Sequence, residues 1–315
     1  MPLIARNLYL LMFVAMALPS ARSSAQQSTD NVCPRDPAAF AQVQSKATDQ
    51  DPAAETALAS CYDLGFHVQP SRSENMRWLT AAAEQGYAPA QYELGRTYLY
   101  GRGIPADYAL ALRWEQKAAD QGDARAQRDL AFMYERGFGV TADPALAAAW
   151  NRKAAGQGQP EAQMQLAKAL ESGAGVTKDP AEAEKWYTKA ADHEQPAAQL
   201  RLAQLHAHDA DCKIALHLYK EAAAGGELQA AHELGMLYLT KKCGADRAQA
   251  YLWFTIGARF GRVDSKTQAE KLSPSLSPAR RRTALSQAEL WIKQHPGADK
   301  EENEKEEDEK EKEEQ

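Results

Sequence analysis

The sequence predicts an all-α protein, a solenoid of about six stacked helix pairs with capping helices at both ends. Two observations carry this prediction. Tryptophan recurs four times at a spacing of 36 residues, within stretches that repeat one another, at Trp78, Trp114, Trp150 and Trp186. Within each stretch the apolar residues fall three and four positions apart, which is the period of a helix with one buried face. One helix pair cannot bury such a face alone, so the copies must stack.

The first 25 residues have the features of a secretory signal peptide. Arg6 precedes an apolar run over residues 8–18, and Ser23 and Ala25 occupy the −3 and −1 positions of a cleavage site before Gln26. The run is shorter than the roughly 20 residues that a transmembrane helix needs. We therefore expect removal of this segment and a mature protein that is periplasmic or secreted. An uncleaved N-terminal membrane anchor is the alternative.

Residues 26–53 form the predicted N-terminal cap of the stack. Asp36 and Pro37 can open a helix that runs to about Gln50. An aspartate side chain accepts hydrogen bonds from the first helical turn, and proline is tolerated at the first helical position. We interpret this helix as the second helix of a pair that lacks its first, covering the open end of the solenoid.

Residues 54–261 contain the predicted repeats, each composed of a helix A and a helix B. In the first full copy the expected buried stripe includes Leu94 and Tyr98 of helix A, and Trp114 with the alanine pair that follows it in helix B. Residues that can cap helix B stand seven positions before each tryptophan or its equivalent: Ser71, Asp107, Asp143, Asp179, Asp211 and Asp246. Glycines expected to end helix B in a left-handed conformation are Gly86, Gly122, Gly158, Gly226 and Gly261.

These copies resemble the Sel-one-like repeat (SLR) family, a relative of the tetratricopeptide repeats. The resemblance lies in A-x-A-Q-x-x-L-G/A-x-x-Y, then G-x-G-V-x-x-D, then W-x-x-K-A-A-x-Q-G. It is strong in the copies that begin near Ala88, Ala124 and Pro160 and weaker in the first and fifth, where Leu218 replaces the tryptophan of the fifth. The resemblance implies a right-handed superhelical α/α solenoid. It also implies an adaptor or scaffold for protein assembly.

Residues 262–297 predict further helices that close the C-terminal end. A short helix is expected over about 265–272, and Ser277 and Pro278 open a longer one. Residues 298–315 follow as an acidic tail with 11 acidic and 4 basic residues. Because such a segment repels itself and has no apolar side chains to bury, we expect it to be disordered.

The charge balance argues against a nucleic-acid partner. Residues 26–297 contain 31 basic and 32 acidic residues, so this part of the chain is nearly neutral and the acidic excess belongs to the tail. Binding a nucleic-acid backbone requires a basic stripe or patch.

The stretch LHAHDADCK, residues 205–213, raises the question of a metal site. Aligned with the fourth copy, Asp211 becomes a helix cap and Cys212 the first helical residue. Only His208 and Asp209 then remain as loop residues, and two ligands make a weak site. We therefore predict no metal site and no cofactor.

Four cysteines in an exported protein predict disulfide bonds. They are Cys33, Cys61, Cys212 and Cys243, which allow three pairings. Each B helix is expected to run antiparallel to the next A helix, so the start of one lies beside the end of the other. This arrangement favours the pairs Cys33–Cys61 and Cys212–Cys243. Free buried thiols are the alternative.

An enzyme remains the alternative function, because some cysteine-rich members of the SLR family have been linked to β-lactam binding or hydrolysis. The chain has no Ser-x-x-Lys, Gly-x-Ser-x-Gly or His-Glu-x-x-His motif. It also lacks the cysteine pair that those relatives carry in nearly every repeat. Paired loop glycines such as Gly101 and Gly103 recur at a fixed phase, which indicates turns and not a phosphate-binding loop. We predict no catalytic residues.

The concave face formed by successive A helices is the predicted binding surface for a protein or peptide partner. Two rows of A-helix positions vary between copies while the framework repeats, and they contain aromatic, methionine and arginine side chains that commonly anchor interfaces. The predicted partner-binding residues are Tyr92, Arg96, Arg128, Phe132, Met164, Lys168, His232 and Met236.

We predict that the mature protein begins at or near Gln26. N-terminal sequencing of the protein isolated from its native host checks this cleavage. An intact Met1 on a cytoplasmic protein would contradict export, and it would also remove the reason for expecting oxidised cysteines.

Overall fold

The structure, a computed structural model, describes residues 32–209 and 211–296. The predicted signal peptide, residues 1–25, and the predicted acidic tail, residues 298–315, lie outside the described residues. No helix within the described ranges is long and apolar enough to cross a membrane.

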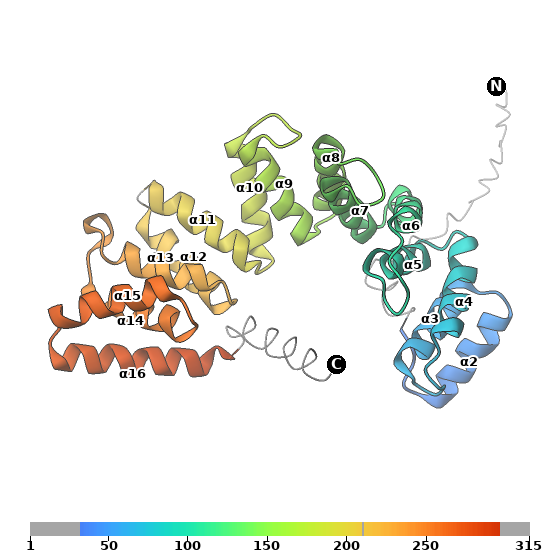
Figure 1. The fold of residues 1–315 in the computed structure, drawn as a ribbon, viewed down its shortest axis with the longest axis horizontal. Helices are drawn as coiled ribbons and strands as arrows, with labels where there is room; N and C mark the ends of the chain where they lie inside the picture. Colours follow the sequence, from blue (N-terminus) through green and yellow to red (C-terminus); the bar gives the residue numbers. More distant parts are fainter. Residues whose placement is uncertain (1–31, 210, 297–315) are drawn as a thin grey trace, which may run out of the picture. The chain divides into compact units, whose positions relative to one another are not determined.

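The described secondary structure is helical throughout, and most helices follow one another as short A and B pairs (Figure 1). The A helices are α3 (Pro52–Leu64), α5 (Ala88–Tyr100), α7 (Ala124–Arg136), α9 (Pro160–Ser172), α11 (Pro196–His208) and α13 (Leu228–Leu237). The B helices are α4 (Arg72–Glu84), α6 (Tyr108–Asp120), α8 (Pro144–Gly156), α10 (Pro180–Asp192), α12 (Cys212–Ala224) and α14 (Arg247–Arg259). The remaining helices are α2 (Pro37–Thr48), α15 (Val263–Leu272) and α16 (Pro278–Gln294), with short 3-10 turns η1 (Lys241–Cys243) and η2 (Ser273–Ser275). This order confirms the predicted all-α repeat architecture.

The chain divides into two compact units between Leu94 and Gly95. In the first unit α2 packs on α3, and α3 packs on α4. Their shared core contains Phe40 and Leu58 together with Cys33 and Cys61. Helix α2 therefore contacts the first repeat in the way expected of an N-terminal cap.

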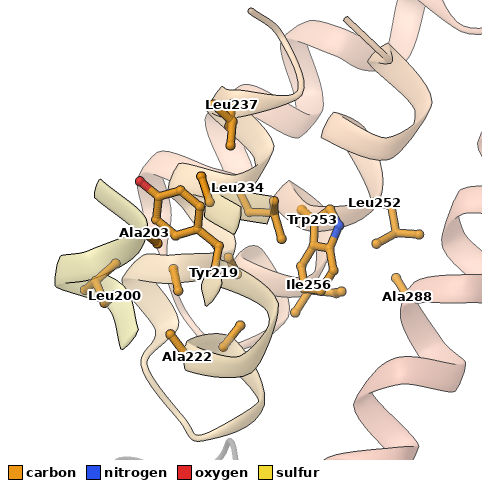
Figure 2. Close-up of a cluster of buried hydrophobic side chains, with 14 of the residues drawn as sticks. Leu200, Ala203, Tyr219, Ala222, Leu234, Leu237, Leu252, Trp253, Ile256 and Ala288 are labelled. Atoms are coloured by element: carbon orange, nitrogen blue, oxygen red, sulfur yellow. The ribbon is translucent and has the colours of Figure 1, made fainter. Parts of the chain in front are cut away.

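In the second unit, from α6 to α15, each helix packs on the next one along the chain, and α16 packs back on α14. The core is built largely from alanine, so helix axes can approach closely, and larger side chains fill its C-terminal end. Figure 2 shows that cluster, where Tyr219, Leu234 and Trp253 meet between α12, α13 and α14. Helix α16 adds Ala288 and stacks Trp291 edge-on against Trp253, at 5.5 Å between ring centroids. These contacts cover the last repeat.

The helix boundaries follow the predicted caps with one exception. The side chains of Ser71, Asp107, Asp143, Asp179 and Asp246 accept hydrogen bonds from backbone N–H groups in the first turn of a B helix. Asp211 stands at the corresponding position of α12 but forms no such bond, so this part of the prediction is wrong. The loop before α12 covers only residues 209–211, against 173–179 in the preceding repeat, and the shorter loop presents the aspartate differently. All five glycines expected after helix B have positive φ angles.

A buried glutamine joins each well-preserved A helix to the B helix before it. Gln91, Gln127 and Gln163 donate from Nε2 to the carbonyl oxygens of Ala83, Ala119 and Ala155, at 3.0, 3.2 and 3.3 Å. Each acceptor lies in the last turn of a B helix, where carbonyl groups lack intrahelical partners. In the first repeat Glu55 replaces this glutamine and accepts a hydrogen bond from Gln85 at 2.7 Å.

The repeated tryptophans are less buried than the sequence pattern suggests. Trp114 is only partly buried, and the buried stripe of α6 consists of Ala111, Glu115, Ala118 and Ala119. The ammonium of the lysine three positions after the tryptophan lies over the indole in three repeats, in the pairs Trp114–Lys117, Trp150–Lys153 and Trp186–Lys189. The residue that follows the tryptophan, and not the tryptophan itself, points into the core.

Both predicted disulfides are present, Cys33–Cys61 and Cys212–Cys243. The first joins the segment before α2 to the last turn of α3. The second joins the first residue of α12 to η1, directly after α13. Both follow the expected rule, because the start of a B helix meets the end of the next A helix. Free thiols are therefore not the arrangement in this structure.

We expect Glu55→Gln to stabilise the protein at neutral pH. Burial, reinforced by the nearby Asp51 carboxylate, raises the pKa of Glu55, whose side chain is 3% exposed. A raised folded-state pKa means that this group's contribution to stability is present at low pH and is lost as the pH rises through that pKa. The neutral amide of glutamine avoids this loss of stability. We therefore expect the free energy of unfolding to rise by an amount on the order of 1 kcal/mol near pH 7.5.

Chemical denaturation at pH 7.5 and at pH 4 measures this difference. The advantage of Glu55→Gln should shrink at the lower pH, while the exposed Glu84→Gln serves as the control with no change at either pH. Equal or lower stability of Glu55→Gln at pH 7.5 would show that the ionised Glu55 carboxylate does not destabilise the folded protein.

Candidate functional site

The eight predicted partner-binding residues do not have equal access to solvent. Tyr92 is only 3% exposed, so a partner cannot reach its ring in this structure, and the prediction is wrong for this residue. Its position on α5 faces the helix packing because the buried stripe is wider than the sequence pattern suggested. Arg96, Arg128, Phe132, Met164 and His232 are partly exposed, and Lys168 and Met236 are exposed.

Three of these residues meet in one pocket of about 230 Å³ in the second unit. Its walls come from helices α5, α7, α8 and α9. The lining residues are Tyr100, Arg128, Asp129, Phe132, Glu135, Asn151, Glu161, Met164 and Gln165. Positions 128, 132 and 135 lie three and four residues apart, so they share one face of α7. Arg128, Phe132 and Met164 of the predicted set thus line this pocket, while Lys168, His232 and Met236 do not.

A buried carboxylate organises the charges of the pocket. The Asp129 side chain is 2% exposed and forms ion pairs with Arg128 at 2.6 Å and with Arg96 at 3.9 Å. A carboxylate so far removed from water requires cationic or hydrogen-bonding partners to stay ionised. Arg96 and Arg128, predicted as partner contacts, therefore also hold the interior charge of Asp129.

An aromatic cluster extends from the pocket along the same surface. The Tyr100 side chain is half exposed, and the guanidinium groups of Arg96 and Arg102 lie 5.5 and 5.8 Å from its ring centroid. Phe132 meets Phe138 edge-on at 5.5 Å. Burial, followed by the nearby carboxylates of Asp129 and Glu115, raises the pKa of the Tyr100 hydroxyl, so it remains a hydrogen-bond donor at neutral pH.

A second polar network connects the A helices further along the chain. Arg201 of α11 pairs with Glu171 of α9 and donates to Gln204 at 2.9 Å, and Gln204 donates to Glu233 of α13 at 2.9 Å. The hydroxyls of Tyr187 and Tyr219 donate to Glu171 and Glu233, each at 2.9 Å. The hydrogen bond from Arg201 lowers the pKa of Glu171, which keeps this link ionised. These side chains satisfy one another and fix the spacing of three repeats.

His232, Ser265 and Asp264 are the residue types of a nucleophilic site, yet their geometry does not support one. The Ser265 hydroxyl lies 3.0 Å from Nδ1 of His232, and Asp264 lies 3.6 Å from the same nitrogen. A base that activates a serine uses one ring nitrogen for the hydroxyl and the other for the carboxylate. Ser265 is also completely buried, facing Gly257. We interpret the contact as one that anchors α15 on α13 and α14.

The histidines of LHAHDADCK do not assemble a metal site in this structure. His208 ends α11 and lies 3.0 Å from Asp209, with both side chains exposed to solvent. Cys212 is bonded to Cys243 and offers no thiolate. No group of three or more metal-binding side chains occurs in the described part of the chain.

Sequence reasoning missed two kinds of pocket residue. Asp129 and Gln165 belong to an A-helix row that carries polar or charged residues in successive copies, next to the row that was singled out. Asn151 directly follows a repeated tryptophan, where other copies have Leu79 or Tyr187. The polarity of these positions within a helical stripe was a signal that could have identified them.

We expect Arg128→Ala to destabilise the protein by about 2 kcal/mol. The substitution removes the cation that lies 2.6 Å from the buried Asp129 carboxylate, and a buried charge that loses a close partner is costly. Chemical denaturation measures the change, with the exposed Lys168→Ala as a near-neutral control. In the double variant Arg128→Ala, Asp129→Asn the loss should be smaller than the sum of the single losses. Strict additivity would contradict the coupling.

Comparison with known proteins identifies the repeat. The Sel1 repeat model matches residues 52–87, 88–123, 124–159, 160–194, 196–227 and 228–259. The crystal structure of a Sel1 repeat protein from Oxalobacter formigenes is 31% identical, covers 66% of this chain and 85% of its own, and superposes with a TM-score of 0.57. A protective antigen of uropathogenic Escherichia coli strains, described as displaying an SLR fold, is 22% identical over 84% of this chain and 82% of its own, with a TM-score of 0.45. No curated protein matches the chain.

The six matched segments coincide with the helix pairs α3–α4 through α13–α14. Together with the identity to the Oxalobacter formigenes protein, they confirm the resemblance read from the sequence. The chain belongs to the Sel1 repeat family.

Proposed function

We propose that this protein is an exported, non-enzymatic scaffold that binds a segment of a partner protein in the pocket between α5, α7, α8 and α9. Sel1 repeat proteins are generally protein-interaction scaffolds. The observation that carries the proposal for this chain is that Arg128, Phe132 and Met164, from two successive A helices, line one pocket.

The composition and size of the pocket favour a protein segment over a small-molecule substrate. Aromatic and methionine side chains supply apolar contact area, while carboxylates, an arginine and amides surround them. A volume of about 230 Å³ is below the range of roughly 300–1,000 Å³ typical of sites for drug-sized ligands. It suits one or two side chains of a larger partner.

The lining also gives no support to the alternative of β-lactam binding or hydrolysis. It contains no serine, cysteine, histidine or lysine, the side chains that usually serve as nucleophile or neutral-pH base in acyl transfer. The one serine–histidine contact described above is buried and has the wrong geometry. A scaffold is therefore the better-supported function.

Export to the periplasm or the medium is part of the same proposal. Two disulfides are typical of oxidising compartments and rare in reducing cytoplasm. The apolar N-terminal run supplies the signal for export. A scaffold placed there would hold its partner outside the cytoplasm.

We expect a photo-crosslinking amino acid at position 132 to capture a specific partner in the native host, while the same group at Leu146 does not. Leu146 is an exposed apolar residue on α8 that does not line the pocket, so it is a matched control. Mass spectrometry of the adducts measures the outcome. Adducts at position 146 and none at 132 would place the binding surface on the B helices.

With that partner in hand, Phe132→Ala combined with Met164→Ala should weaken binding at least tenfold, because interface anchors typically contribute about 2 kcal/mol or more. Both residues are partly exposed and carry no ion pair, so the substitutions spare the Asp129 cluster. Unchanged affinity would contradict the pocket as the site.

A further inference from the structure

The lining of the pocket includes a largely buried amide side chain. Asn151 is 6% exposed, lines the pocket from α8, and its carboxamide forms no hydrogen bond with another described residue. Largely buried amides in proteins are nearly always hydrogen-bonded, and the Asn151 amide is not among the described polar atoms that are cut off from solvent, so a polar group entering the pocket can bond to it. The Asn151 amide therefore indicates that this pocket is shaped to receive polar groups of a ligand.

The net charge of the pocket lining indicates that the ligand is positively charged. Glu135 and Glu161 line the pocket, and neither forms an ion pair with another described residue. The arginine of the lining, Arg128, pairs with the lining aspartate Asp129 at 2.6 Å. The lining thus carries two carboxylates in excess of its cations.

The position of Glu135 makes its negative charge unfavourable unless a cation binds near it. It lies in the last turn of α7, at the negative end of the helix dipole, where a carboxylate is unfavourable and a cation is favoured. Glu161 lies in the first turn of α9, where the positive end of the dipole favours a carboxylate. A cation bound between the two carboxylates would offset the unfavourable interaction of Glu135 with its helix dipole. Glu161 would keep its favourable position.

The walls of the pocket fit the rest of a basic side chain. Tyr100 and Phe132 present aromatic rings, and Met164 presents a flexible apolar side chain. Lysine and arginine bury their methylene stems on apolar surfaces, and their charged ends are attracted to ring faces. The pocket volume is that of a side chain rather than of a whole peptide.

The geometry points to a recognition pocket for a lysine or arginine side chain of the bound protein segment. The basic group lies between the carboxylates of Glu135 and Glu161, its stem lies on Tyr100 and Phe132, and Asn151 pairs with the polar groups that enter beside it. This inference rests on the proposed function and specifies the chemistry of its partner.

The test is selection of a random peptide library displayed on phage against the full oxidised chain. We expect enrichment of peptides with a lysine or arginine at one fixed position. The same selection against Glu135→Gln, Glu161→Gln should lose that preference, and selection against Glu135→Lys, Glu161→Lys should replace it with aspartate or glutamate. The control Glu184→Gln, Glu289→Gln removes two exposed carboxylates outside the pocket and should behave as the parent chain does.

Synthetic versions of the selected peptides then give affinities. Each neutralised rim carboxylate should weaken binding roughly threefold, with the difference shrinking at high salt. Asn151→Leu should weaken it roughly tenfold, since the amide is lost. This variant is expected to fold, because Leu79 occupies the equivalent position in the first repeat, and circular dichroism confirms it.

The outcomes separate the two proposals. Peptides that bind the pocket without a basic residue, or that keep their basic preference in Glu135→Gln, Glu161→Gln, overturn the inference and leave the scaffold function standing. If no peptide is enriched by the parent chain and position 132 captures no partner, the proposed function fails and this inference fails with it.

Discussion

The structure depends on the hydrogen bond from a buried A-helix glutamine to the end of the preceding B helix. The last carbonyl groups of a helix have no partner within it, and here they face the next helix and not water. Gln127 meets this need for α6 and in turn accepts a hydrogen bond from Gln157 of the following B helix, at 2.9 Å. One side chain thus joins two successive repeats. Because the bond is buried, its loss would leave the Gln127 amide without this acceptor, whereas the Ala119 carbonyl oxygen would still accept from the Gly122 N–H at 3.0 Å.

Alanine packing sets how close the helices approach, and that closeness decides which side chains the core can accept. The residue after a repeated tryptophan packs against the A helix of its own repeat, as Glu115 and Phe254 do, so its size must match the residue opposite on that helix. Gly95 lies against the Glu115 carboxylate, and Gly235 lies against the ring of Phe254, where an added Cβ would come within about 3 Å of the neighbour. Asn151 occupies the equivalent position in α8, and there it lines the pocket.

The charged groups of the second unit divide into those that hold repeats together and those that face outward. Asp129 is buried with Arg128 and Arg96, and Glu171 is paired with Arg201 across two A helices. Phe132, three residues after Asp129 on α7, also lines the pocket. A single A helix can therefore serve stability and recognition at once, since its positions three and four apart share a face.

The sequence by itself determined the repeat, most helix caps, the turn glycines and the disulfide pairs. These features depend on local backbone geometry or on helix order, both of which a period of 36 residues specifies. It also singled out Arg128, Phe132 and Met164, which line one pocket. Only the tertiary structure decided that Tyr92 is buried, that Arg128 balances Asp129 and that Asn151 lines a pocket. The physical reason is that burial and pairing depend on the size and charge of the residue opposite, on another helix, and periodicity along one chain does not contain that information.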